Sequence, residues 1–373
     1  MSSVRVLHVV AADRWTGAAA AAELLVEAQL AAGIECAFAF RAGENLADRL
    51  RGRSWAQPVL RKERSIADLR AALATLRSLA AGCDVVHTHL PHDHLLARLA
   101  LRDGGPPIVR SVRHLKHLRP DPFHRLLFRR TAAIALANSA MVPLLRRFPS
   151  LAELPHAVLP PVVERRFSVL SDRGERERRR RAVRAALAIP ADAVVAGTVG
   201  KLDRGRAHDL LLRAVAATPD LWALIVGHGP AEKGLRALAS SLGAADRFAW
   251  AGYVGDGLED HYAAMDLAVF PAVGSDHGHR AVVEAAGCGL PVLAADLPGV
   301  ADLVRPGVTG ELYPAEDAAA LAVLLRRWAG DPARRGAASA AARELAARWS
   351  GAGLAAVTVA LYRDGGSTVR PAP

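Results

Sequence analysis

Cysteine is scarce in this sequence. Cys36, Cys83 and Cys288 are the only three in 373 residues, and they lie far apart in the chain. Their positions show none of the short spacings with which cysteines hold zinc. The scarcity excludes a disulfide-rich scaffold and fits a reduced, cytoplasmic setting.

Long apolar runs are also absent. Although 51% of the residues are hydrophobic, they never form a run of about eighteen, which excludes an ordinary transmembrane helix. The first ten residues, MSSVRVLHVV, show no long apolar stretch followed by a cleavage site. We expect a first β-strand there and no signal peptide.

Aromatic residues amount to 5% of the chain, and the sequence lacks basic motifs interleaved with aromatics and any recognised nucleic-acid module. We therefore predict no nucleic-acid partner, although the net charge is +11. The charge is uneven, with +14 on residues 1–190 and −3 on residues 191–373. The basic half is either a surface for anionic lipid or phosphorylated small molecules, or the plain result of an arginine-rich composition.

What the sequence does have is a regular alternation of strands and helices. In the first half, strands are predicted at Val4–Val10, Glu35–Phe40, Val85–His89, Ile108–Val112 and Ala133–Ala137. Helices are predicted between them, at residues 18–32, 65–80, 93–101, 120–130 and 140–148, with Ser65 as an N-cap. Strands that alternate with helices form a parallel sheet covered on both faces.

A charge run, SDRGERERRRRA at residues 171–182, interrupts this pattern and suits a linker or the first exposed helix of a second unit. The alternation then restarts, with strands predicted at residues 194–199, 222–226, 248–251, 267–270 and 291–294. VTGELYP at residues 308–314 predicts a hairpin, and helices are predicted at residues 315–329, 332–348 and 353–362. Two successive sheets predict two Rossmann-like domains that bind a ligand in their cleft, at the carboxyl ends of the strands.

The stretch Ser275–Pro291 is the main candidate for a ligand site. Its polar loop, SDHGH, leads into a helix predicted at residues 280–287. A helix N-terminus suits phosphate because its backbone N–H groups are unpaired and carry a partial positive charge. Asp276 in the loop and Glu284 on the helix could hold two ends of one ligand. The alternative is a surface loop that caps a core helix, with Glu284 as a solvated charge.

Two cations follow the first strand of the second half. The segment GKLDRGRAHDLLLRA places Lys201 and Arg206 in a loop between a strand and a helix. Cations at the carboxyl end of a strand can hold a diphosphate and stabilise it as its charge grows on departure. The alternative is a pair of exposed loop charges. VGHGP adds a Gly-x-Gly turn with Gly227 and Gly229, which is a weak signal by itself.

Three motifs lie at strand ends in the first half. WTGAAAAAELL opens a helix with Gly17. DVVHTHLP places His87 inside a strand and His89 at its end, and such histidines are more often satisfied core residues than ligands. IVRSVRHL brings Arg113 and His114 to the end of the next strand.

Two further stretches have more than one interpretation. HTHLPHDH (residues 87–94) and DHGH (residues 276–279) are rich in histidine but lack the spacing of a recognised zinc site, so we predict no metal. RPDPFHRLLFRR (Arg119–Arg130) predicts an amphipathic basic helix. This helix either lies on an anionic membrane surface or buries its apolar side in the protein core.

Taken in order, these motifs resemble those of GT-B retaining glycosyltransferases of the GT4 type. In that family an acid, seven residues and a Glu precede a small-residue helix and a Cys-Gly-x-Pro turn. Asp276 and Glu284 keep this spacing, with Asp in place of the first Glu and His-Gly-His in place of Gly-Phe-Gly. Lys201 and Arg206 swap the family's Arg and Lys. The resemblance covers residues 191–345 and is looser before them, where only Gly17 remains of a Gly-Gly loop.

The resemblance implies an α/β fold of the GT-B class, with two Rossmann-like parallel-sheet domains facing a cleft. It implies an N-terminal acceptor-side domain at residues 1–168, completed by a C-terminal helix that crosses back at residues 350–363. A basic linker or first helix is expected at residues 169–190 and a nucleotide-sugar donor domain at residues 191–349. A flexible tail is expected at residues 364–373.

The same resemblance implies a retaining nucleotide-sugar-dependent glycosyltransferase without cofactor or metal. The residues implied for the donor diphosphate are Lys201, Arg206, Gly17, His277, Gly278, His279 and Arg280. Those implied for the nucleotide and its ribose are Glu284, Gly227 and Gly229. The implied catalytic residues are Asp276, for the sugar hydroxyls, Glu284, and His114, which contacts the sugar, with Arg113 as the other alignment. The leaving phosphate assists the acceptor's proton, so no protein nucleophile is expected.

The acceptor is predicted only as a glycan, lipid-linked or small molecule, as in polysaccharide biosynthesis. We expect a cytoplasmic enzyme, and the contact of Arg119–Arg130 with the inner face of the membrane stays open. The alternative is a GT-B-shaped protein that binds a nucleotide or glycan without catalysis. That alternative rests on the reduced Gly-Gly loop and on Asp276. Asp is one methylene shorter than the family's Glu, so its carboxylate lies farther from the substrate, and a catalytic site tolerates such a displacement poorly.

Overall fold

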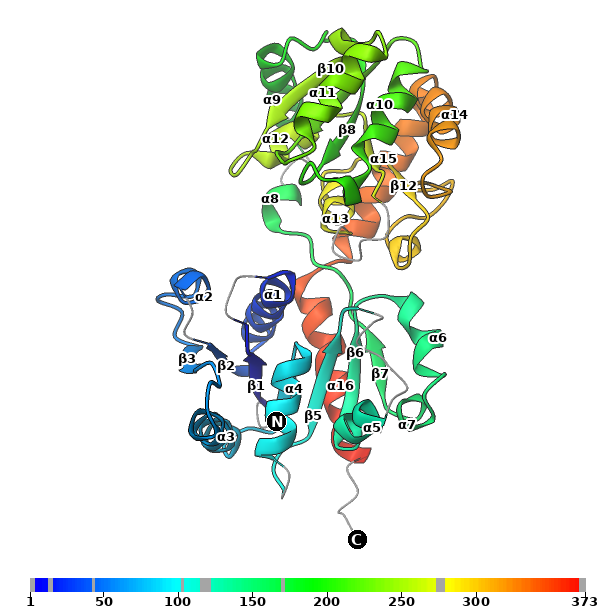
Figure 1. Ribbon diagram of the computed structural model, residues 1–373. Helices are drawn as coiled ribbons and strands as arrows, with labels where there is room; N and C mark the ends of the chain where they lie inside the picture. Colours follow the sequence, from blue (N-terminus) through cyan, green and yellow to red (C-terminus); the bar gives the residue numbers. More distant parts are fainter. Residues whose placement is uncertain are drawn as a thin grey trace. The chain divides into compact units, whose positions relative to one another are not determined.

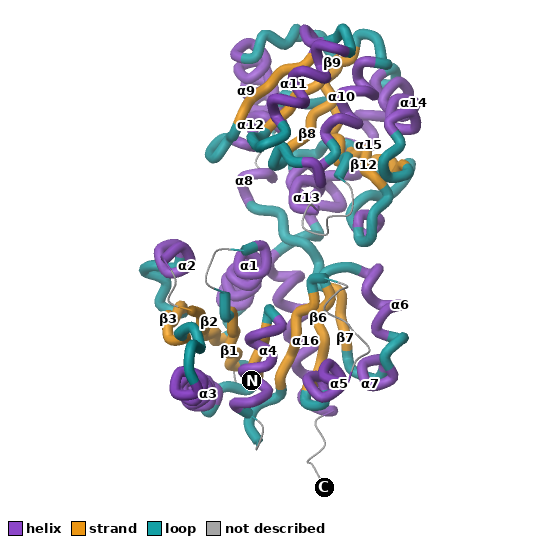
Figure 2. The backbone as a smooth tube through the Cα atoms, in the orientation of Figure 1, coloured by secondary structure: helices purple, strands orange, loops and turns teal. Residues whose placement is uncertain are grey.

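The computed structural model describes residues 4–12, 16–41, 44–101, 104–114, 122–168, 172–272 and 279–368. The chain divides into two compact units (Figure 1). Unit 1 comprises residues 1–161 together with residues 350–373, and unit 2 comprises residues 162–349. Each unit has one sheet of parallel strands with helices packed on it (Figure 2).

The sheet of unit 1 has seven strands in the order β3-β2-β1-β4-β5-β6-β7, and every pair is parallel. The strands are β1 (Arg5–Val10), β2 (Glu35–Arg41), β3 (Ala56–Leu60), β4 (Val85–Thr88), β5 (Ile108–Val112), β6 (Thr131–Leu136) and β7 (His156–Val158). From β1 the chain first adds β2 and β3 on one side of the sheet. It then crosses over and adds β4 to β7 on the other side of β1. Such a reversal opens a crevice at the carboxyl ends of the strands.

Helices cover both faces of this sheet. They are α1 (Gly17–Ala31), α2 (Glu44–Arg49), α3 (Ile66–Ala80), α4 (Pro91–Ala100), α5 (Pro122–Phe128), α6 (Val142–Leu145), α7 (Pro149–Ala152) and α16 (Gly351–Thr368). Leu76 of α3 and Leu96 of α4 pack in one apolar cluster, and Ala355 and Tyr362 of α16 pack in another. In Figure 1 the red helix α16 lies behind the sheet and α4 in front of it, so the end of the chain completes unit 1.

Local sequence explains where several helices begin. The Thr16 hydroxyl accepts a hydrogen bond from the Ala19 N–H and caps α1. Ser65 does the same for α3 with the Asp68 N–H, which confirms the predicted N-cap. These side chains satisfy backbone donors that the first helical turn leaves unpaired.

Unit 2 has six parallel strands in the order β10-β9-β8-β11-β12-β13. They are β8 (Val194–Val199), β9 (Leu221–Val226), β10 (Phe248–Gly252), β11 (Leu267–Phe270), β12 (Val292–Ala295) and β13 (Gly310–Tyr313). The helices are α8 (Arg165–Ser168), α9 (Arg173–Ala186), α10 (His208–Ala216), α11 (Glu232–Ser241), α12 (Leu258–Ala263), α13 (His279–Gly287), α14 (Ala318–Ala329) and α15 (Pro332–Ala347). The order of the strands reverses at β8, which places this sheet's crevice beside β8 and β11.

The two parallel-sheet units confirm the predicted fold class, but several local predictions need correction. The segment VTGELYP is not a hairpin, because β13 pairs with β12 in parallel. For the charge run, the interpretation as a helix of the second unit is confirmed: α9 begins at Arg173, and its Arg184 is buried and bonds to the carboxylate of Asp266. Residues 364–368 continue α16 rather than forming a tail. The strands β3 and β7 were not predicted.

Among the described helices, no single one combines the length and apolarity needed to cross a bilayer. The pair α15 and α16 meets that requirement only when the two helices are counted together.

Candidate functional site

Only the last residue of the polar loop Ser275–His279 lies within the described part of the chain. Asp276, His277 and Gly278 lie outside the described residues, and the description resumes at His279, the first residue of α13. The predicted helix after this loop is therefore present, with Arg280 and Glu284 on it. Because α13 connects β11 to β12, it lies beside the reversal of strand order in the unit 2 sheet.

Glu284 is a buried carboxylate held by two donors. Its exposed fraction is 6%, so it is not the solvated helix charge of the alternative interpretation. The Tyr262 hydroxyl donates to Oε2 at 2.9 Å, and the Arg280 Nε–H donates to Oε1 at 2.6 Å. Arg280 also donates through Nη2 to Glu164 at 2.6 Å. The carboxylate therefore has both oxygens fixed in direction, as a binding group requires.

The electrostatics around Glu284 oppose one another. The pKa of Glu284 lies above its usual value because burial raises it more than the charge of Arg280 and the hydrogen bonds from Arg280 and Tyr262 lower it. The pKa of Tyr262 is well above its usual value, chiefly because of burial and then because of the neighbouring carboxylate. Tyr262 is thus a neutral donor at every physiological pH.

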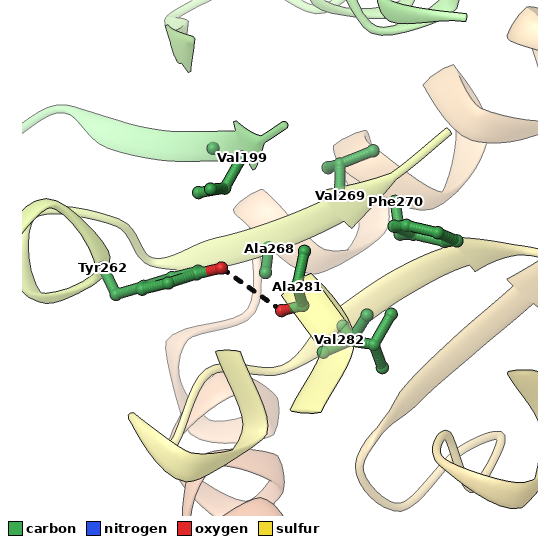
Figure 3. Close-up of a pocket in the computed structure, with 9 residues that line it drawn as sticks. Val199, Tyr262, Ala268, Val269, Phe270, Ala281 and Val282 are labelled. Atoms are coloured by element: carbon green, nitrogen blue, oxygen red, sulfur yellow. Dashed lines mark hydrogen bonds between the residues drawn. The ribbon is translucent and has the colours of Figure 1, made fainter. Parts of the chain in front are cut away.

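A small cavity lies beneath α13 (Figure 3). Its lining is apolar apart from the Tyr262 hydroxyl, which points to the Ala281 carbonyl at 3.3 Å. The cavity holds about 10 Å³, enough for roughly one water molecule. It is therefore a packing gap next to Glu284 and too small to admit a nucleotide.

Lys201 and Arg206 lie in one loop, between β8 and α10. The Lys201 side chain is 66% exposed, and its Nζ is 3.8 Å from the Asp203 carboxylate. The backbone of this loop is anchored by His208, whose Nε2 lies 3.2 Å from the Lys201 carbonyl. The loop follows the carboxyl end of β8, and α13 follows the carboxyl end of the neighbouring strand β11, so the loop with both cations and the start of the helix that carries Glu284 lie at the same edge of the unit 2 sheet.

The two glycines of the Gly-x-Gly turn pack against this cationic loop. A Cβ on Gly227 would lie 1.8 Å from the Gly200 carbonyl oxygen, and one on Gly229 would lie 2.3 Å from the Leu202 carbonyl oxygen. Backbone hydrogen bonds join the same segments, including Leu202 N–H to the His228 carbonyl at 3.1 Å. Both glycines, predicted for the nucleotide, therefore allow the loop that carries Lys201 to approach β9 closely.

The N-terminal candidates belong to unit 1. Gly17 is the first residue of α1, directly after its cap Thr16, while residues 13–15 lie outside the description. Arg113 and His114 follow β5 and are half-buried. Gly17 thus begins the helix that follows β1, and Arg113 and His114 come directly after the carboxyl end of β5.

Arg110, which the sequence interpretation missed, lies on β5 close to the half-buried Arg113. Arg110 is 2% exposed, and burial lowers its pKa and that of Arg113 to about 10. Within the described part of the chain, neither has an ion pair. The nearby Asp93 caps α4 by accepting from the His89 and Leu90 N–H groups, and burial raises its pKa to about 6.

The histidines of β1 and β4 form a buried network. His8 and His87 are paired across the two strands, and His8 Nδ1 is 3.0 Å from His89 Nε2. His87 bonds to the hydroxyls of Tyr362 and Ser111, and His8 bonds to the Gln29 side chain. Since Tyr362 belongs to α16, this network ties the last helix to the sheet. His87 is thus a satisfied core residue, as the sequence favoured.

These three histidines also bring their ligand atoms within 4.8 Å of one another. Their rings are stacked, with centroids 4.5–5.3 Å apart and planes inclined by 16–29°. Stacked rings direct their in-plane lone pairs along similar directions, whereas a tetrahedral metal needs them to converge. Five of the six ring nitrogens already have hydrogen-bond partners. The cluster suits a hydrogen-bonded core better than a metal.

Acid is expected to weaken the protein through this network. Burial lowers the pKa of His8 to about 4 and those of His87 and His89 well below 6.5. Between pH 6.5 and 4 the unfolded chain binds protons that the folded chain does not. Each such histidine then lowers the free energy of unfolding by about 1.4 kcal/mol per pH unit as pH falls. Asp93 offsets the effect of one histidine between pH 6 and 4. Its pKa is raised to about 6, so in this range the folded chain holds a proton on Asp93 that the unfolded chain lacks.

Urea unfolding at pH 7, 6 and 5 measures this loss. The variant His8→Gln should reduce the pH slope by about one proton. A slope that is identical in the two proteins would mean that His8 does not resist protonation.

The basic helix proposed for a membrane surface is short. It is α5 (Pro122–Phe128), and residues 115–121 lie outside the description. Leu127 and Phe128 pack in an apolar cluster of unit 1, while Leu126 is exposed. Most of the described apolar side of α5 is therefore in the core, and a single leucine faces outward.

Comparison with known proteins agrees with this geometry. Residues 179–345 match the family "Glycosyl transferases group 1", and residues 15–148 match "Glycosyltransferase Family 4". A D-inositol 3-phosphate glycosyltransferase of Streptomyces scabiei is 32% identical over 70% of this chain and 64% of its own length. One from Thermobispora bispora is 31% identical over 75% of this chain and 70% of its own length. The chain thus spans slightly less than two thirds of the Streptomyces protein.

Solved structures share the fold. An Anabaena protein, Alr3699/HepE in complex with UDP, has a TM-score of 0.80 at 20% identity, covering 96% of this chain and 98% of its own. A glycosyltransferase from Rickettsia africae has a TM-score of 0.83 at 13% identity, covering 98% and 99%. These structures show that the chain has the GT-B fold. Within that class the chain belongs to the group 1, GT4-like family, which confirms the resemblance seen in the sequence.

Proposed function

We propose that this protein transfers a glycosyl group from a nucleotide-sugar to an acceptor with retention at the anomeric carbon. The observation that carries the proposal is the gathering of a buried, doubly held carboxylate and two loop cations at the reversal of strand order in unit 2. Such a reversal is where doubly wound sheets bind nucleotides. The family membership supplies the reaction class.

The residues take complementary roles in this proposal. Lys201 and Arg206 hold the donor diphosphate, and both stabilise it further as its charge grows when the sugar departs. Glu284 accepts hydrogen bonds from the ribose hydroxyls. Asp276 takes the sugar hydroxyls, and His114 also contacts the sugar; both roles stay predictions from the sequence. The leaving phosphate assists the acceptor's proton, and no metal is needed to neutralise the diphosphate.

Uridine nucleotides are the first donors to test. The Anabaena neighbour was crystallised with UDP, with UDP-glucose, and with UDP and glucose, which supports a UDP-sugar here. The relatives are named for D-inositol 3-phosphate, which supports a phosphorylated polyol as acceptor. The acceptors to test are therefore a phosphorylated polyol, glycans and lipid-linked sugars.

The decisive experiment combines the purified protein with UDP-, GDP- and ADP-sugars and this acceptor panel. Release of nucleotide that depends on the acceptor would support transfer, and the anomeric configuration of the product by NMR would test retention. Tight nucleotide binding without turnover on any acceptor would instead favour a non-catalytic GT-B protein. An inverted product would overturn the retaining assignment alone.

Alanine at Lys201 or Arg206 is expected to weaken nucleoside diphosphate binding by about 10- to 100-fold, since a hydrogen bond to a charged group contributes about 1.5–3 kcal/mol. Binding of the nucleoside without phosphates should stay the same. Titration calorimetry with UDP and uridine measures both. The control is Lys233→Ala, an exposed lysine of α11 in the same unit. Equal losses for UDP and uridine would argue against a diphosphate contact.

A further inference from the structure

Tyr262 has no place in the roles assigned so far, yet it is the most rigid contact of Glu284. It lies on α12 and is 1% exposed. Its ring packs edge-on against Phe167, with centroids 5.8 Å apart and planes at 85°. In Figure 3 the ring lies along the cavity wall with its hydroxyl directed toward α13.

The other side-chain contact of Glu284, Arg280, is less firmly held in place. Arg280 is on the same helix, its side chain is 62% exposed, and it divides its guanidinium between Glu284 and the half-exposed Glu164. An exposed arginine can turn away when a ligand arrives, because little packing holds it. Tyr262 is held in place, because its side chain is 1% exposed and its ring packs against Phe167. The direction of the Glu284 carboxylate is therefore set by the 2.9 Å hydrogen bond from the Tyr262 hydroxyl.

This hydrogen bond also acts on charge. A ribose hydroxyl donates its proton most strongly to an ionised carboxylate. Burial pushes Glu284 toward the protonated form, and each hydrogen bond to its oxygens favours the ionised form instead. A tyrosine is suited to this task because it donates without adding a charge that would compete for the donor's phosphates.

We propose that Tyr262 is a positioning residue for the donor, whose hydroxyl holds the Glu284 carboxylate oriented toward the ribose hydroxyls. The proposal rests on the proposed function, because it takes Glu284 as the ribose-binding group. Tyr262 itself does not touch the donor; it acts through Glu284.

The test compares two substitutions that each delete one buried oxygen. Tyr262→Phe removes the hydroxyl that bonds to Glu284. Tyr313→Phe is the matched control, because Tyr313 is also buried in unit 2 and its hydroxyl has no hydrogen-bond partner among the residues described. Melting curves come first, and affinities are then measured at a temperature where both variants are folded.

Tyr262→Phe is expected to raise the Kd for UDP and the KM for the sugar donor by about tenfold, while kcat changes by less than about threefold. The acid limb of UDP binding should move to higher pH, because Glu284 loses a hydrogen bond that favours its ionised form. Tyr313→Phe should show neither change. A role in packing alone would lower the melting temperature without moving the acid limb.

A double-variant cycle separates this inference from the proposed function. In Glu284→Ala, adding Tyr262→Phe should change the UDP affinity no further, because the group that Tyr262 holds is already gone. If Glu284→Ala leaves UDP affinity intact, the ribose assignment itself is wrong. If Glu284→Ala weakens UDP but Tyr262→Phe behaves like Tyr313→Phe, only the positioning role is overturned.

Discussion

Replacing Glu284 with alanine is expected to lower kcat/KM for the nucleotide-sugar by roughly 10²- to 10⁴-fold, since it removes two hydrogen bonds from ribose hydroxyls to a charged acceptor, each contributing about 1.5–3 kcal/mol. Most of the loss should appear as weaker donor binding, because the ribose is bound equally in the ground state and the transition state. The Tyr262 hydroxyl and the Arg280 guanidinium also lose their shared acceptor.

Steady-state kinetics and UDP calorimetry measure this effect, with a melting curve to account for the lost internal hydrogen bonds. Glu344→Ala is the matched control, because Glu344 is an exposed helical glutamate of the same unit that pairs with Arg348. Should Glu284→Ala and Glu344→Ala bind UDP equally well, Glu284 would be a structural residue of α13, and the proposed donor site would have to be placed elsewhere.

Gly227→Ala should destabilise the protein more than any exposed substitution. The new Cβ would lie 1.8 Å from the Gly200 carbonyl oxygen, and the backbone there has φ +148°, which other residues rarely adopt. Both the clash and the strained backbone act at one position, so we expect the free energy of unfolding to fall by about 3–5 kcal/mol. For a unit of this size that is a fall in melting temperature of about 6–20 °C.

The control for this prediction is Gly243→Ala. Gly243 also has a positive φ, +66°, but nothing lies within 4 Å of its added Cβ. It should cost only about 1–2 kcal/mol, the penalty of the left-handed backbone. Denaturant unfolding of both variants separates the clash from the backbone term. Equal losses would show that the loop bearing Lys201 can move away from β9 without penalty.

The sequence predicted the strands and helices whose pattern is strong. The buried strand Ile108–Val112 was predicted with its observed bounds, and Leu267–Phe270 likewise. The edge strands β3 and β7 were missed, because edge strands are short and mixed in composition: Val59 of β3 is exposed, and β7 has three residues. The hairpin at residues 308–314 was predicted from a local turn signal, whereas the pairing of β13 is set by its distant neighbour β12.

For the site, the sequence identified residues but not their supports. Glu284 follows from the spacing of its motif, yet Tyr262 is 22 positions away and nothing in its own surroundings marks it as the donor to that carboxylate. The Gly-x-Gly turn was predicted to line the nucleotide. The motif alone does not reveal that both glycines also face the backbone of Gly200 and Leu202. Asp276, His277 and Gly278 lie outside the described residues, so their roles stay predictions.

The position of α16 has a consequence for how the chain acquires its structure during synthesis. Most of unit 1 precedes unit 2 in the chain, but its core includes Leu361 and Tyr362, which follow unit 2 and so are synthesised after it. Unit 2 is continuous in sequence, so it can fold while unit 1 still lacks one of its covering helices. Unit 2 need not wait for unit 1, as the usual N-terminal-first order would have it. Until α16 has been synthesised, the part of the first sheet that packs against it, including His87, lacks that cover.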